Sequence, residues 1–194
     1  MTNGNGRVKI KTFWGRNKLL EISVRTQIDK VAFYAGQLGQ DGKVATHMTH
    51  YVDLVTAGRI ARQIVSASEG FSFKEYKGGA DNGQVTSRIL EMSVSKTKKG
   101  SMALFITLSQ GLGKKTETGA VLPAGEPTQK MTVAVPLGDA QDAFYALDAV
   151  ITGLIQAGHG LPKDKNGNGN AGSASDVEDV EDAPAPEEDE DLIF

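Results

Sequence analysis

The sequence contains no cysteine, which excludes a disulfide framework, a thiolate zinc site and a cysteine nucleophile. It has no apolar run that approaches the roughly 18 residues of a membrane-spanning helix. The opening stretch MTNGNGRVKIK also lacks the apolar segment of a secretory signal peptide. We therefore expect an intracellular, cytoplasmic protein with no membrane partner.

Signatures of catalysis and of metal binding are missing or broken. The stretch QGLGKKT (110–116) matches a phosphate-binding loop only in part, because Lys115 stands where Ser or Thr is required. DKNGNGN (164–170) begins like a calcium loop, but Ser175 occupies the twelfth position, where a bidentate Glu is needed. The three histidines are too scattered to suggest a shared metal. We accordingly predict no enzyme activity, no cofactor and no metal site.

Lysine and arginine are absent after Lys165, although ten acids lie there. Of the 24 acids, 14 therefore remain in residues 1–165 with all 21 basic side chains, a net charge of +7. A basic body joined to an acidic segment points to a polyanionic partner. The Gly-, Asn- and Ser-rich stretch 157–175 is typical of a flexible linker. We predict a folded body over residues 1–160, then a flexible linker with a disordered acidic tail over 161–194.

Four short strings of the body recur in the same order. They are IKTFWG with FKEYKG, LLEISV with ILEMSV, AFYAGQ with ALFITLSQ, and MTHYVDLVTAGRIARQI with MTVAVPLGDAQDAFYAL. Each match is weak alone, but the common order indicates an internal repeat over about 8–66 and 71–157.

Each copy has the pattern of four strands followed by a helix. Residues 19–24 alternate between apolar and polar, as a half-buried strand does. Apolar residues at helical spacing follow Thr56 and Asp139, which we expect to be N-caps, and Gly158 should end the second helix. The predicted fold is α+β, a duplicated β-β-β-β-α unit forming two antiparallel sheets with two helices. The alternative is an OB-fold β-barrel, whose five strands and single helix fit less well.

Antiparallel sheets commonly bury one face and expose the other, so the outward strand residues are the functional candidates. Basic side chains bind phosphates, and flat aromatic rings stack on the bases of single strands, whereas a duplex hides its bases. By the period-two rule, the outward residues are Lys9, Lys11, Phe13, Arg25 and Tyr34 in the first copy, and Lys74, Tyr76 and Phe105 in the second. The loop SKTKKGS (95–101) adds Lys96, Lys98 and Lys99. Trp14 stays unassigned, because it shares the parity of the buried residues but stands at a strand end.

The duplicated unit resembles the Whirly and transcriptional-coactivator group of single-stranded DNA-binding folds. In that group two four-stranded sheets with helices pack together, and nucleic acid runs over the strands. The likeness rests on topology over residues 7 to about 157. It implies binding of single-stranded DNA, and it leaves a homo-oligomer as one option.

The segment EEDEDLIF (187–194) resembles the tip of bacterial and phage single-stranded DNA-binding proteins, where an acidic run precedes a short apolar ending closed by Phe. This chain carries Leu-Ile-Phe where the cellular proteins have an Ile-Pro-Phe type of ending. The resemblance implies that a replication or recombination protein binds Asp189, Glu190, Asp191, Leu192, Ile193 and Phe194. Apolar groups would anchor this contact, and the acids would steer it toward basic surfaces.

Together the two resemblances predict a sequence-nonspecific single-stranded DNA-binding protein used in DNA replication, recombination or repair. The tip favours a viral protein of phage type that acts in the infected bacterial host cell. Two alternatives stay open. One is a strand-annealing recombination protein, and the other is an interaction protein whose basic body binds an acidic protein instead of nucleic acid.

Overall fold

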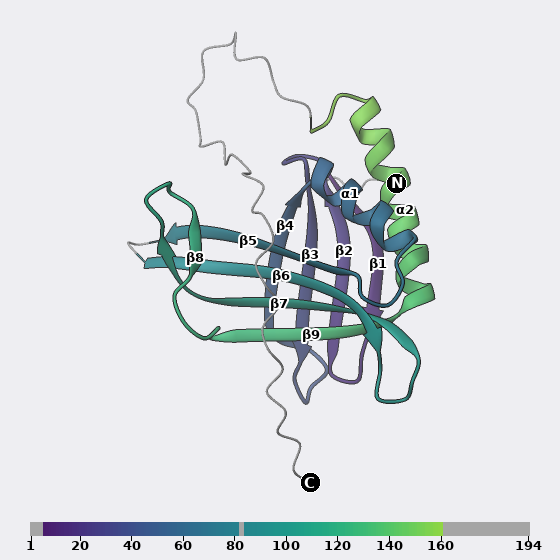
Figure 1. The fold of residues 1–194 in the computed structure, drawn as a ribbon, viewed down its shortest axis with the longest axis horizontal. Helices are drawn as coiled ribbons and strands as arrows, with labels where there is room; N and C mark the ends of the chain where they lie inside the picture. The colour runs from purple at the N-terminus through teal and green to yellow at the C-terminus, as the bar shows by residue number, and fades with distance from the viewer. Residues whose placement is uncertain (1–5, 82–83, 161–194) are drawn as a thin grey trace. The chain divides into compact units, whose positions relative to one another are not determined.

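The computed structural model describes residues 6–81 and 84–160 (Figure 1). The predicted linker, acidic tail and partner-binding tip lie outside these residues. The first half contains β1 (Arg7–Trp14), β2 (Lys18–Arg25), β3 (Lys30–Leu38), β4 (Val44–Asp53) and α1 (Leu54–Val65). The second contains β5 (Ser72–Asp81), β6 (Gln84–Lys96), β7 (Met102–Lys115), β8 (Val121–Pro123), β9 (Gln129–Pro136) and α2 (Leu137–Gln156).

The strands form two antiparallel sheets, which confirms the predicted α+β architecture. The first sheet has the order β1-β2-β3-β4. In the second sheet β5, β6, β7 and β9 are neighbours, and the short β8 pairs with the far end of β7. The strands of the two sheets run across one another, and the two helices lie together at one side of the crossed sheets (Figure 1). No helix within the described ranges is long and apolar enough to cross a membrane.

The inner faces of the two sheets and one side of each helix share a single apolar core. Ile22 of β2 and its repeat counterpart Met92 of β6 are both almost completely buried, and Phe33 of β3 stacks on Phe144 of α2 with ring centroids 6.3 Å apart. The gapless match of residues 48–64 with 131–147 is also seen in the pattern of burial. Residues at matching positions are buried in both copies, namely Met48 and Met131, Ala57 and Ala140, and Ile64 and Leu147.

Both helices begin earlier than the sequence suggested. Asp53 and Pro136 are the residues that precede α1 and α2, with extended backbones at ψ 146° and 135°. Each strand therefore runs directly into its helix, with no loop between them. Thr56 and Asp139, the predicted N-caps, lie inside the first turn instead.

Residues 111–130 resemble a long loop in sequence, but the structure extends β7 to Lys115 and returns the chain as β8. Val121 of β8 lies directly over Gly78 and Gly113. A Cβ atom added to Gly78 would come within 1.9 Å of the Val121 Cβ, so only glycine permits this approach. The returning hairpin thus covers part of the outward side of the second sheet.

Candidate nucleic-acid interface

A β-bulge in β1 changes which aromatic side chain of that strand faces outward. The pairing shifts between Lys9 and Lys11, so that Ile10 is an extra residue. Beyond the bulge, Phe13 lies opposite the buried Leu20 and packs against the core. The prediction that Phe13 points outward is therefore wrong, because one inserted residue inverts the alternation for the rest of the strand.

Trp14 takes the outward position that Phe13 loses. It lies opposite Leu19 at the end of β1 and is 69% exposed. An exposed tryptophan on a sheet face is a large flat ring open to a ligand. The sequence alone could not place it, because nothing in KIKTFW shows that one residue is inserted.

We define the first outer face as the outward side of β1–β4. Besides Trp14 it carries Tyr34, whose ring stacks on His47 with centroids 5.4 Å apart and planes at 26°. His47 is exposed and Tyr34 is half-buried, so the pair presents a ring plane that is already fixed in position. Tyr51 lies farther along the same side of β4 and is half-buried.

Basic side chains lie on the same face, toward the end of β1 and β2 that is opposite to Trp14. Lys9 is exposed, and Arg25 is half-buried on the neighbouring strand. Arg7 forms an ion pair with Glu21, an acid of the same face. Four polar atoms here are buried without a hydrogen-bond partner among the described residues, namely Arg7 Nε, Thr12 Oγ1, Ser23 Oγ and Arg25 Nε. The first outer face thus combines positive charge, open aromatic rings and unused hydrogen-bonding capacity.

The second outer face, the outward side of β5–β9, is less aromatic. Tyr76 is 41% exposed, and the ammonium of Lys74 lies 5.3 Å from its ring centroid. Lys74 also contacts Glu91 at 2.6 Å, and this hydrogen bond raises the pKa of Lys74 above its ordinary value. Phe105 is half-buried beside a hollow of about 200 Å³. Lys74, Tyr76 and Phe105 therefore share one face, as predicted.

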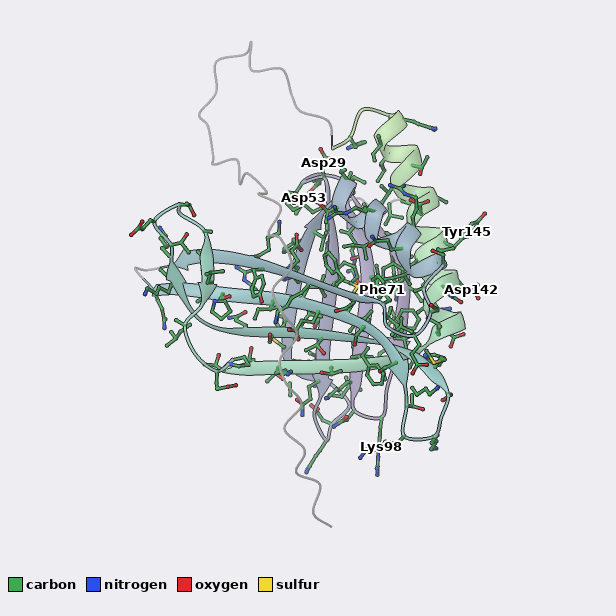
Figure 2. All side chains as sticks on the ribbon, viewed as in Figure 1. Asp29, Asp53, Phe71, Lys98, Asp142 and Tyr145 are labelled. Atoms are coloured by element: carbon green, nitrogen blue, oxygen red, sulfur yellow. The ribbon has the colours of Figure 1, made fainter. Side chains whose placement is uncertain are left out.

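The structure does not bring all the predicted residues together. The two sheets pack through their inner faces, so their outer faces point away from each other. Lys11 lies opposite the buried Ile22, so the bulge places it on the core side of β1 and not on the outer face as predicted, although its side chain is exposed. Lys96, Lys98 and Lys99 are exposed near the turn between β6 and β7, where Figure 2 shows Lys98 pointing away from the body. Lys96 contacts Glu69 at 3.3 Å.

The helix surface offers a poor alternative for an anion. Tyr145 of α2 is 70% exposed and points outward (Figure 2). Its neighbours on the helix include the acids Asp142 and Asp148, and Asp148 pairs with Arg62 of α1 at 2.9 Å. Carboxylates around an exposed ring repel phosphate groups, which leaves the sheet faces as the better candidates.

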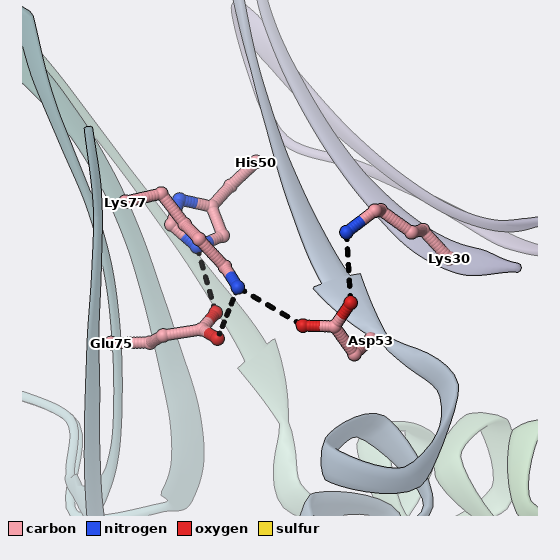
Figure 3. A network of polar contacts seen from close by, with 5 residues as sticks. All are labelled: Lys30, His50, Asp53, Glu75 and Lys77. Carbon is pink, nitrogen blue, oxygen red and sulfur yellow. Dashed lines mark hydrogen bonds and ion pairs between the residues drawn. The ribbon is translucent and has the colours of Figure 1, made fainter. Parts of the chain in front are cut away.

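A polar network connects the two sheets where β4 meets β5 (Figure 3). His50 Nε2 lies 2.8 Å from Glu75 Oε2, and Lys77 contacts Glu75 at 3.3 Å. Asp53 bridges two lysines, with Lys30 at 2.8 Å and Lys77 at 3.1 Å. Sequence analysis did not predict this cluster, because Lys30 and Lys77 lie 47 positions apart in the chain.

The network shifts two pKa values in opposite directions. Burial alone would raise the pKa of Asp53, but the hydrogen bonds from Lys30 and Lys77 hold it below its ordinary value. Burial alone would lower the pKa of Lys77, but attraction to Glu75 and the hydrogen bond to Asp53 raise it. Both groups therefore stay charged at neutral pH. Between residues 6 and 160, as far as they are described, no group of three His, Asp or Glu side chains could hold a metal ion.

Comparison with solved structures supports the fold, but it does not assign the chain to a protein family. The chain is similar to the crystal structure of WHY1 from Arabidopsis thaliana, with a TM-score of 0.54 and 12% sequence identity. The match covers 78% of this chain and 93% of WHY1. No family model and no curated protein sequence matches the chain. The Whirly-like arrangement of two sheets and two helices is thus shown by the structure.

Proposed function

We propose that this protein binds single-stranded DNA without strong sequence preference through the outer faces of its sheets. The main observation in its support is Trp14, which is 69% exposed on the same face as the stacked pair of Tyr34 and His47 and as Lys9 and Arg25. Base stacking on an aromatic ring contributes roughly 1–3 kcal/mol per base and depends little on sequence. The fold shared with WHY1 supports the proposal, because the Whirly group that the sequence resembles binds single-stranded DNA.

The first outer face is the main binding surface in this proposal. Its Trp14 is 69% exposed, whereas Tyr76 of the second outer face is 41% exposed. The second outer face, with Tyr76 and Phe105, extends the site for longer strands. The net charge of +7 in residues 1–165 supplies the attraction to phosphates.

The test is a titration of the full chain with fluorescently labelled oligonucleotides. Single strands should bind and a duplex of equal length should bind far more weakly, since its bases cannot reach the rings. If four to eight phosphates are contacted, log K should fall against log salt with a slope of about −3 to −6. Equal affinity for the duplex would contradict stacking. Absence of any binding at low salt would favour the alternative of an acidic protein partner.

We propose further that residues 176–194 recruit replication or recombination proteins. The segment carries all ten acids of the C-terminal region and the apolar group Leu192, Ile193 and Phe194, and its resemblance to the tips of single-stranded DNA-binding proteins supports this role. A linker of 30 residues has a root-mean-square reach of about 30 Å. The acids could therefore return to the basic body and compete with DNA.

The phage-type origin, the roles in recombination and repair, the intracellular setting and self-association stay predictions.

Two truncations separate the roles of this segment. Removal of residues 176–194 should tighten binding of single strands, most strongly at low salt, where charges are least screened. Removal of Leu192, Ile193 and Phe194 alone keeps every acid, so DNA affinity should stay unchanged while capture of a replication partner is lost. Loss of DNA affinity in the shorter truncation, with partner capture retained, would contradict the assignment.

A further inference from the structure

A cleft of about 320 Å³ opens between the two sheets beside the polar network. Strands β5 and β6 continue past the edge of the first sheet (Figure 1). Lys77 and Arg88, which pair with each other on these strands, line the cleft. The cleft is lined by Ile28, Lys30, His50, Tyr51, Lys77 and Arg88. A volume near 300 Å³, with an apolar wall and a few polar groups, is at the small end of ligand sites in proteins.

The mouth of the cleft is positively charged. The side chains of Lys30 and Lys77 are 37% and 34% exposed, and Asp53 holds both of them at the cleft wall. Arg88 has no ion pair among the described side chains, and its guanidinium presents a planar set of donors suited to a phosphate. The charges at the mouth are thus in position before any ligand arrives.

His50 is one of the residues that line the cleft, and one of its ring nitrogens has no partner among the described residues. His50 is only 2% exposed, and its Nδ1 is buried without a partner among the described residues. Glu75, which is ion-paired to Lys77, can only accept a hydrogen bond, so His50 Nε2 carries the proton. In the neutral ring Nδ1 is then an acceptor. A buried acceptor of this kind suits an N–H group on the edge of a nucleic-acid base.

The cleft is continuous with the first outer face. Tyr51 and Ile28 also line a second hollow of about 190 Å³, on the side of Arg25 and Gln27. Ile28 is 51% exposed, and with the Tyr51 ring it forms an apolar ridge between the two hollows. A strand on the first outer face can therefore turn over this ridge into the cleft without leaving basic surface.

We propose that the cleft binds one nucleotide of the single strand, with its base against Tyr51 and Ile28 and its phosphate on Lys77 and Arg88. This inference rests on the proposed function and adds to it a specific subsite. The base edge faces His50 Nδ1, and the chain on either side continues over the first outer face. Occupancy of the cleft anchors the strand at the edge of the first sheet.

Variants of the cleft give the first arm of the test. Arg88→Gln should make the salt dependence of oligothymidylate binding shallower by about 0.7 in the log–log slope, the loss of one phosphate contact. Arg59→Gln is the matched control, because Arg59 is exposed on α1 and does not line the cleft.

Tyr51→Ala should weaken binding about 5- to 150-fold. Tyr51→Phe keeps the ring and should retain full affinity, and Ile28→Ala provides a milder change at an exposed position.

Free ligands give the second arm. Thymidine monophosphate added to isotope-labelled protein should shift the NMR signals of His50, Tyr51 and Arg88, and thymidine should shift them less because it lacks the phosphate. If the protein binds oligonucleotides but every cleft variant behaves like Arg59→Gln and the monophosphate shifts none of these signals, the subsite is wrong and the proposed function stands. If oligonucleotides do not bind at all, the proposed function is wrong. Signals that shift elsewhere but not at the cleft would also overturn the subsite.

Discussion

The two halves of this protein agree on the inside and differ on the outside. Ile22 and Met92 occupy matching inner positions of β2 and β6, and Ile64 and Leu147 match on the two helices. On the outside, β1 contains a bulge that β5 lacks, and only the second half has the β8 hairpin. Packing tolerates little change in a shared core. The outward positions are free of that constraint, so the differences between the halves indicate where function lies.

The bulge gives the two halves different ring arrangements from similar strings. IKTFWG and FKEYKG align in sequence, yet Phe13 faces the core and Tyr76 faces outward. The first half gains an exposed Trp14, whereas the second keeps a ring partly covered by the cation of Lys74. One inserted residue therefore assigns the larger stacking surface to the first sheet.

The largest expected effect is a loss of stability on substitution of Phe13, compared with its repeat counterpart Tyr76. Phe13→Ala removes a ring that packs against the core and should lower the free energy of unfolding by roughly 2–4 kcal/mol, somewhat less than for a fully buried ring. Tyr76→Ala should cost under about 1 kcal/mol of stability, because its ring lies on the surface. Urea unfolding of both variants measures the difference. Equal losses in the two would show that the bulge does not invert the strand.

The second prediction compares the rings that the halves share, Tyr34 on β3 and Phe105 on β7. Each Ala substitution should weaken single-strand binding by roughly 1–3 kcal/mol if the ring stacks on a base. Tyr34→Ala should have the larger effect, because it also removes the stack with His47. Fluorescence titrations at fixed salt measure both. A loss confined to Phe105→Ala would move the main surface to the second sheet.

The third prediction uses the hairpin that only the second half has. Gly78→Ala places a Cβ against Val121 and should displace β8, with a loss of roughly 1–2 kcal/mol in stability. Gly79→Ala is the matched control, since the nearest heavy atom to its added Cβ is 3.6 Å away. Thermal unfolding of the two variants should differ. Equal unfolding temperatures would mean that β8 does not pack on the sheet.

The smallest expected effect concerns the bridge between the halves. Asp53→Asn removes the carboxylate that holds Lys30 and Lys77, and it should cost roughly 0.2–1 kcal/mol at pH 7, because the pair is half-exposed and screened by solvent. The folded-state pKa of Asp53 lies below its ordinary value of 3.8, so its stabilisation is present above that pH and is lost as the pH falls through the folded pKa. The wild type and the variant should therefore become equally stable in acid. A stability difference that does not shrink as the pH falls below 3.8 would contradict the assignment.

Sequence periodicity was sufficient for the architecture because the core positions alternate strictly in β2, β3, β6 and β9. The repeat alignment paired every strand except β8, which has no counterpart in the first half. The outward placement of Tyr34 and Phe105 followed from the buried Phe33 and Leu104 beside them. Both helix starts were predicted three residues late, because the strands enter the helices directly.

The rest depended on tertiary structure. The alternation of residue types in β1 does not reveal the bulge. Phe13 was therefore predicted to point outward, whereas in the structure it faces the core and Trp14 faces outward. The cleft requires β5 and β6 to extend past β4, and neither strand length nor sheet crossing can be inferred from composition. Tyr51 could have been noticed, since it shares the outward parity of His47 and Thr49, but its position beside Arg88 of the other sheet could not.

Trp14 itself reports on the proposed binding surface, because it is the only tryptophan of the chain. The intrinsic fluorescence of the unmodified protein is followed while a single-stranded oligothymidylate is added, and binding is monitored in parallel by the anisotropy of a labelled strand. Stacking of a base on the exposed ring should quench the emission along the same curve as the anisotropy, and a duplex of equal length should leave the emission unchanged. Emission that stays constant while the labelled single strand binds would show that nucleic acid does not cross the first outer face.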